Sequence, residues 1–182
     1  MKISESKFRG VLIIEPDVFN DSRGYFFETF NSNRYKDHGI SIDFVQDNIS
    51  VSKKSTLRGL HYQIPPKAQA KLCHVLKGRV LDVAVDLRFG SPTFGKHFAL
   101  ELSEENHIQI FIPEGFAHGF AVLSDEAIFH YKCSEFYSKE HERAIRFDDS
   151  DININWAIDD LIVSVRDRNA ELFKDIEKVF RF

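Results

Sequence analysis

The sequence has few cysteines, no long apolar run and no cluster of basic residues. Cys73 and Cys133 both lie inside apolar, strand-like segments, and a chain of 182 residues buries enough surface to fold without disulfides. We therefore expect reduced thiols in a cytoplasmic protein. No apolar stretch approaches the ~18 residues that a membrane helix needs. The first ten residues also lack the apolar core of a signal peptide, so no membrane partner is expected.

The charge balance argues against a nucleic-acid partner. Lys and Arg number 24 against 28 Asp and Glu, giving a net charge of −4, and the basic residues do not gather in one run. Phenylalanine, in contrast, is abundant: eighteen Phe in one chain predict an aromatic core or an aromatic-lined cavity. Neither a linker nor a repeat interrupts the sequence, so we expect residues 1–182 to form a single domain.

Short segments rich in Val, Ile, Phe and Tyr alternate with Gly, Pro, Asn and Asp turns along most of the chain. This spacing is typical of an all-β sandwich or barrel. The expected strands are 11–14, 25–30, 44–51, 56–63, 71–76, 80–87, 97–102, 108–112, 117–123, 128–136 and 144–147. Two short helices are expected besides, one at 31–38 ended by Gly39 and an amphipathic one at 169–180. The aspartate-rich segment 148–168 is expected to wrap back over the barrel.

The segment IPEGFAHGF contains a Pro-x-Gly turn followed by His118. It resembles the second motif of the cupins, in which such a turn carries a histidine into the mouth of a jelly roll. The first cupin motif supplies His-x-His and a glutamate seven residues before a turn glycine. Counting back from Gly78 gives Lys71, and Gln63 occupies the second histidine's position after His61. An ammonium donates no lone pair and repels a cation, so the sequence predicts a jelly-roll site without a metal, suited to negative charge.

The stretch RGLHYQ, residues 58–63, reads as a strand that carries a titratable histidine. Strict alternation places Arg58 and His61 on opposite faces. If both serve one site, a twist or bulge at Gly59 must bring them together.

Several long segments occur in an order that resembles the dTDP-4-dehydrorhamnose 3,5-epimerase family of cupin-fold sugar-nucleotide epimerases. They extend from about Val11 to Asp167 and read EPDVFNDSRGYFFETFN, FVQDNISVSKKSTLRGLHYQ, QAKLCHVLKGRVLDVAVDLRFGSPTFGK, IPEGFAHGFAVLSDEAIFHYKCSEFYS and SVRD. The resemblance implies a cupin-type jelly roll and conversion of dTDP-4-dehydro-6-deoxy-D-glucose to dTDP-4-dehydro-L-rhamnose. It also implies a homodimer with N-terminal strands exchanged between subunits, and no cofactor.

The resemblance also assigns roles to single residues. His61 matches the family's base, Asp167 the carboxylate that orients it, Tyr131 the proton donor and Lys71 the cation at the keto oxygen. These types suit the chemistry, because epimerisation beside a ketone needs a base, an acid on the other face and positive charge at the developing enolate. The substrate-binding positions are Arg23, Glu28, Gln46, Asp47, Asn48, Arg58, His118, Glu142 and Arg166, the last standing where the family commonly has lysine.

Other interpretations remain open at this point. Without the resemblance, His61, Tyr131 and Lys71 read as structural residues of a β-protein. Asp82 and Asp86 share a face of one strand, where either can orient a site residue or form a structural pair. The alternative functions are a metal-dependent cupin, a sugar-nucleotide binding module without catalysis, and a 3- or 5-mono-epimerase acting on a related nucleotide-linked 4-keto sugar.

Overall fold

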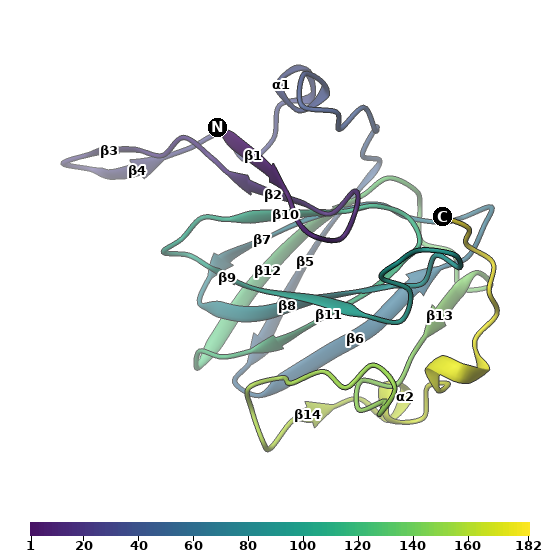
Figure 1. Ribbon diagram of the computed structural model, residues 1–182. Helices are drawn as coiled ribbons and strands as arrows, with labels where there is room; N and C mark the ends of the chain where they lie inside the picture. The colour runs from purple at the N-terminus through teal and green to yellow at the C-terminus, as the bar shows by residue number, and fades with distance from the viewer.

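The computed structural model describes residues 1–182 and consists of two antiparallel sheets that face each other (Figure 1). The first sheet has the order β1 (Lys2–Glu5), β2 (Leu12–Glu15), β10 (Gln109–Ile112), β7 (Lys71–Lys77), β12 (Glu126–Cys133) and β5 (Gln46–Lys53). The second has the order β13 (Glu142–Ala144), β6 (Thr56–Gln63), β11 (Phe116–Val122), β8 (Arg79–Asp86) and β9 (His97–Ser103), with β14 (Ile162–Val163) running parallel beside β6. The predicted all-β class is confirmed.

Five short elements lie outside the two sheets. The strands β3 (Phe19–Asp21) and β4 (Gly24–Phe26) form a hairpin that projects away from the body (Figure 1). The helices are α1 (Ser32–Lys36), α2 (Val165–Arg168) and the 3-10 turn η1 (Phe173–Asp175). None of the helices is long and apolar enough to cross a bilayer. The sequence pattern did not predict β1, β3 or β14.

The space between the sheets is filled by aromatic and aliphatic side chains. Phe116 and Phe120 from β11 meet Phe129 from β12, and the rings of Phe120 and Phe129 stack with centroids 4.2 Å apart. Alternation accounts for this layer, since every second residue of each strand points inward. The expected aromatic core therefore occupies one part of the interior and leaves the other part open for a site.

Two chain segments cover the outer faces of the sheets. The segment that contains α1 packs Tyr35 and Ile40 on the first sheet. Asn31 caps the helix with its side chain, and the helix, Ser32–Lys36, lies within the predicted range 31–38. The segment after β13 wraps over the second sheet, where Ile152 and Trp156 are buried. Both coverings continue the hydrophobic core beyond the sandwich itself.

The predicted amphipathic helix at 169–180 is wrong. Only η1 forms there, while the short helix α2 lies just before it. Ile176 and Phe180 do bury against the second sheet, but the chain reaches them extended, and the Phe180 carbonyl accepts a hydrogen bond from the backbone of Phe89. Twelve residues form a marginal helix on their own, so contacts with the sheet decide their conformation.

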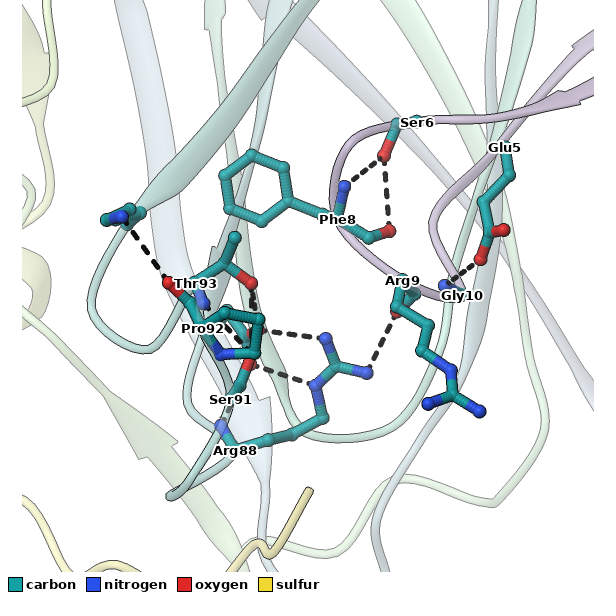
Figure 2. A network of polar contacts seen from close by, with 11 residues as sticks. Glu5, Ser6, Phe8, Arg9, Gly10, Arg88, Ser91, Pro92 and Thr93 are labelled. Carbon is teal, nitrogen blue, oxygen red and sulfur yellow. Dashed lines mark hydrogen bonds and ion pairs between the residues drawn. The ribbon is translucent and has the colours of Figure 1, made fainter.

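A polar network at one end of the sandwich joins the turn after β8 to the loop between β1 and β2 (Figure 2). The fully buried carboxylate of Asp86 accepts hydrogen bonds from the guanidinium of Arg88 and the hydroxyls of Ser91 and Thr93. Figure 2 shows Arg88 reaching from this turn to the backbone carbonyl of Arg9, 2.9 Å away. Of the two aspartates on β8, Asp86 is therefore the one in a structural pair.

Candidate active site

A cavity of about 510 Å³ opens between the sheets, where β5 and β12 of the first sheet face β6 and β11 of the second. All four predicted catalytic residues line it, together with six of the nine predicted binding residues: His61, Lys71, Tyr131, Asp167, Gln46, Asn48, Arg58, His118, Glu142 and Arg166. Residues up to 121 positions apart in the sequence, from Gln46 to Asp167, thus meet at one surface.

A β-bulge in β6 places Arg58 and His61 in the same cavity. His118 and Phe120 on β11 are two residues apart, but their partners His61 and Arg58 on β6 are three apart, so β6 carries one extra residue. Gly59 occupies the bulge with φ of +139°, and a Cβ there would approach the Cα of Gly119 to 2.5 Å. Only glycine fits such a position. The bulge required by the RGLHYQ pattern is confirmed.

His61 is held by a buried carboxylate. Its Nε2 lies 2.7 Å from Oδ1 of Asp167, whose side chain is only 5% exposed. Asp167 sits in the first turn of α2, where its backbone N–H bonds the capping hydroxyl of Ser164. Burial opposes ionisation, but hydrogen bonds from His61, Ser164 and the Gly59 backbone hold the pKa of Asp167 below its usual value. The pair fixes the ring so that Nδ1 remains free to act as a base.

Two cations in the cavity have no carboxylate partner. Lys71 is 92% buried, and its ammonium lies 3.5 Å from the backbone carbonyl of His61. The guanidinium of Arg58 donates through Nε to the hydroxyl of Ser52 at 3.0 Å. Neither residue forms an ion pair within the protein, so both charges are available to an anionic ligand or to negative charge that develops during a reaction.

Tyr131 lies on β12, in the sheet opposite His61. Burial raises the pKa of its phenol to about 12, so the hydroxyl is a neutral proton donor at neutral pH. The hydroxyl makes no hydrogen bond within the protein, while the ring packs against Phe129 with centroids 6.0 Å apart. The ring is therefore fixed and its donor is free.

His118 has its own carboxylate partner deeper in the sandwich. Nε2 of His118 lies 2.8 Å from Oδ2 of the fully buried Asp82. The thiol of Cys73 lies close by, so that the ligand atoms of Cys73, Asp82 and His118 all fall within 4.8 Å of one another. This trio is the set that can hold a metal ion by residue type. At the position of the first cupin motif, by contrast, Lys71 is a cation that offers no lone pair to a metal.

The outer part of the cavity contains polar side chains that bind one another. Arg166 pairs with Glu142 at 2.8 Å, and hydrogen bonds from Arg166 and Tyr137 outweigh burial and lower the pKa of Glu142. Gln46 donates to Asn48 at 3.0 Å and accepts from the backbone of Tyr137 at 2.9 Å. A lysine at position 166, as the family commonly has, would offer a single point charge to Glu142 in place of the planar guanidinium of Arg166.

Two residues of this region were not singled out by the sequence. Tyr137 exposes its ring at the mouth of the cavity and donates its hydroxyl to Glu142 at 2.8 Å. Gln63, at the missing cupin histidine's position, donates to the Lys67 and Phe136 carbonyls and accepts from the backbone of Ser138. It therefore holds the loop that carries Tyr137. Both residues lie inside segments that carried the family resemblance, which was the available signal.

Comparison with known proteins agrees with this geometry. A family model described as dTDP-4-dehydrorhamnose 3,5-epimerase matches residues 5–175. The chain belongs to this family. The chain is 51% identical over 178 residues to a dTDP-4-dehydrorhamnose 3,5-epimerase of Shigella flexneri, covering 97% of this chain and 98% of the relative. The resemblance identified in the sequence is confirmed.

Solved structures of the family share the fold over the whole chain. A dTDP-6-deoxy-D-glucose-3,5-epimerase of Legionella pneumophila in complex with dTDP-4-keto-L-rhamnose has a TM-score of 0.95 and 45% identity, covering 100% of this chain and 98% of that one. A 3′-monoepimerase of Streptomyces bikiniensis in complex with dTDP-quinovose has a TM-score of 0.88 and 32% identity, covering 93% and 86% of the two chains.

Three of the binding residues expected from the epimerase family lie outside the cavity of a single chain. Arg23 stands at the tip of the β3–β4 hairpin, 88% exposed, and pairs with Asp21. Glu28 pairs with Arg34 at 3.1 Å beside α1. Asp47 points from β5 to the opposite side of the sheet, where both its oxygens accept from Lys132 at 2.9 Å. In a single chain, these three expected binding residues therefore lie apart from the catalytic residues.

Proposed function

We propose that the protein converts dTDP-4-dehydro-6-deoxy-D-glucose to dTDP-4-dehydro-L-rhamnose by removing and returning protons at C3 and C5. Loss of a proton beside the C4 ketone gives an enolate, and return of a proton to the other face inverts the carbon. His61 removes the proton through Nδ1, while Asp167 holds the opposite nitrogen and stabilises the imidazolium that forms.

The observation that carries this proposal is the position of the base and the acid on opposite walls. His61 belongs to β6 of the second sheet, and Tyr131 to β12 of the first. A sugar ring bound between the sheets would therefore present one face to the imidazole and the other to the phenol. Inversion requires this arrangement, because a single acid–base group on one face returns the proton to the side it came from.

The enolate oxygen is assigned to Lys71. Its unpaired ammonium is buried, and in a site that excludes water such a charge stabilises a developing oxyanion more strongly than it would in solvent. Because the charge is supplied by a side chain, we propose that the reaction needs no metal and no redox cofactor. Dialysis against a strong chelator should leave the rate unchanged. Loss of activity that Zn²⁺, Fe²⁺ or Mn²⁺ restores would overturn this part of the proposal.

The nucleotide end of the substrate is assigned to the outer cavity. Arg58 has a free guanidinium that suits the diphosphate, and the exposed ring of Tyr137 offers a flat surface to the base. Gln46 and Asn48 supply amide groups beside it. His118, deeper in the cavity, is placed near the sugar.

We further propose that the protein acts as a homodimer in which the β3–β4 hairpin of each chain reaches the cavity of the other. The hairpin carries Phe19, Tyr25 and Phe26 with more than half of each side chain exposed, and β5 exposes Ile49 and Val51 along a free sheet edge. Apolar side chains in this density on a projecting element are typical of an interface. The arrangement would bring the partner's copy of the hairpin tip, and with it a further cation, to the substrate.

Mixing two inactive variants tests this arrangement. In Arg23→Ala the hairpin lacks its cation, and in His61→Ala the cavity lacks its base. If the hairpin acts across the dimer, each mixed dimer keeps one intact site, and re-equilibrated equal mixtures recover about a quarter of the wild-type rate. No recovery from dimers shown to have exchanged would place Arg23 in its own chain's site. Full activity of Arg23→Ala by itself would place Arg23 outside any site.

Proton NMR in D₂O tests the reaction itself. With dTDP-4-dehydro-6-deoxy-D-glucose, deuterium should enter at both C3 and C5. Exchange at only one carbon after long incubation would support the mono-epimerase alternative, for which the 32% identity to a 3′-monoepimerase is the favouring observation. No exchange at all would support a binding module. The free buried thiols of Cys73 and Cys133 support a reducing, cytoplasmic location.

A further inference from the structure

Asp82 is a fully buried carboxylate with a single hydrogen-bond partner. Its Oδ2 accepts from Nε2 of His118 at 2.8 Å, and its Oδ1 is buried without any partner. Buried carboxylates usually have most of their lone pairs satisfied, as Asp86 on the same face of β8 does with Arg88, Ser91 and Thr93. Asp82 therefore does not resemble a carboxylate that holds the fold together.

The position of Asp82 relates it to the catalytic base. His118 and His61 face each other directly across the β11–β6 ladder, so their side chains lie next to each other on the inner face. Asp82 lies one strand further on, opposite Phe120 in the β11–β8 ladder. Each of the two neighbouring histidines thus donates through Nε2 to its own buried carboxylate, His61 to Asp167 and His118 to Asp82.

We propose that Asp82 is a positioning residue, which fixes His118 with Nε2–H directed to the interior and Nδ1 presented to the cavity. His118 lines the cavity and Asp82 does not. In the neutral ring, Nδ1 is then a hydrogen-bond acceptor that can receive a sugar hydroxyl and fix the ring of the substrate relative to His61. The kinetic part of this inference rests on the proposed epimerase function, but the geometry of the ring does not.

The substitution Asp82→Asn tests the inference because of the unpartnered oxygen. If the asparagine kept its carbonyl on His118, its NH₂ would occupy the place of Oδ1, where no acceptor is available. In the opposite orientation the asparagine NH₂ donates to Nε2 of His118, and only the asparagine carbonyl is left without a partner. A buried carbonyl without a partner costs less than a buried N–H without one. The variant should therefore force the proton of His118 onto Nδ1, the opposite tautomer.

Ring ¹⁵N NMR of histidine-labelled protein reads the tautomer without any substrate. Wild-type His118 should show a protonated Nε2 at neutral to mildly alkaline pH, and Asp82→Asn a protonated Nδ1. His118→Asn assigns the signal. The same tautomer in both proteins would overturn the inference, whatever reaction the protein catalyses. This result is thus distinguishable from a failure of the proposed function, which would appear as a wild-type protein that does not exchange protons of the dTDP sugar.

The kinetic consequence is a loss of catalytic efficiency in Asp82→Asn. The value of kcat/KM should fall by about 10- to 100-fold, because the substrate hydroxyl would lose its acceptor on His118. A purely structural role for Asp82 would lower the melting temperature and leave the tautomer of His118 unchanged, and that result would contradict the inference.

Cys73→Ala is the matched control, since it removes a buried group within 4.8 Å of the same pair. It should leave the tautomer and kcat/KM unchanged. Equal losses in Cys73→Ala and Asp82→Asn would indicate that the trio acts as a metal site, and would refute the positioning role.

Discussion

Replacing Tyr131 by phenylalanine should separate proton exchange from inversion. The substitution removes one oxygen and keeps the ring that packs against Phe129. Since the hydroxyl has no partner within the protein, its loss leaves no buried donor or acceptor unpaired, and the free energy of unfolding should change by less than about 1 kcal/mol. His61 and Lys71 are untouched, so removal of the proton and formation of the enolate should continue.

The return of the proton to the opposite face should fail in this variant. General acid catalysis contributes about 10²–10⁴-fold to the rate, which corresponds to a lowering of the activation free energy by about 2.7–5.5 kcal/mol. The imidazolium of His61 can still return a deuteron to the face from which the proton came. Proton NMR in D₂O should therefore show loss of the C3 and C5 signals of the unconverted sugar at a nearly normal rate, while the inverted product forms at least about 10²-fold more slowly. If water replaces the missing acid at one carbon, the effect should be smaller at that carbon than at the other.

The control is Tyr62→Phe. Tyr62, on β6, is another tyrosine that borders the cavity, and burial raises its pKa to about 12 as well, but its ring packs against Phe180 in the cluster that covers the second sheet. This variant should exchange and invert like the wild type. If Tyr131→Phe abolishes exchange while His61→Ala leaves it intact, the acid and base assignments are reversed. Equal, small effects of both variants would mean that the cavity is not the active site.

Four further substitutions test the contacts described above. His61→Ala should slow exchange at C3 and C5 together by about 10²–10⁴-fold, because one base removes both protons. Lys71→Met should slow both by about 10²-fold, because each deprotonation places negative charge on the same C4 oxygen. Unequal losses at the two carbons in NMR would contradict this. Asp86→Ala should lower the free energy of unfolding in urea by about 3–5 kcal/mol, because it leaves the guanidinium of Arg88 without its carboxylate. Burial raises the pKa of Asp86, but hydrogen bonds from that guanidinium and from two hydroxyls outweigh it, so the pKa lies below 3.8. The stability that ionised Asp86 contributes is therefore complete above pH 3.8 and is lost as the pH falls through the lower pKa of the folded state. Gly59→Ala should abolish activity and lower the melting temperature, since the new Cβ would collide with the backbone of β11; a fully active variant would show that the bulge is not needed.

The amino-acid sequence was sufficient for the class of the fold and for most of the chemistry. Short β-branched and aromatic segments between turn residues predicted the strands, because alternation and turn preference are local properties. The same alternation placed Arg58 and His61 on opposite faces and thereby required the bulge at Gly59 that the structure contains. Lys71 at a metal-ligand position likewise indicated, from residue type alone, a site suited to negative charge.

Local pattern was insufficient where distant contacts decide conformation. Residues 169–180 have a helical apolar pattern, yet the second sheet and the backbone of Phe89 hold them in an extended chain, because those contacts outweigh the weak propensity of a short segment. For the same reason the two aspartates of β8 could not be told apart. Their strand and face are identical, and only the neighbours differ: Arg88 beside Asp86, and His118 beside Asp82.

The arrangement of the site was decided by tertiary structure alone. The sequence named His61 and Tyr131, but the sandwich places them on facing sheets, and the outward course of β3 and β4 carries Arg23 away from its own chain's cavity. The type of a residue determines which proton or charge it can offer, and the sequence gives the type directly. Which face of a substrate it meets depends on strand pairing between residues far apart in the chain, and no local pattern records that.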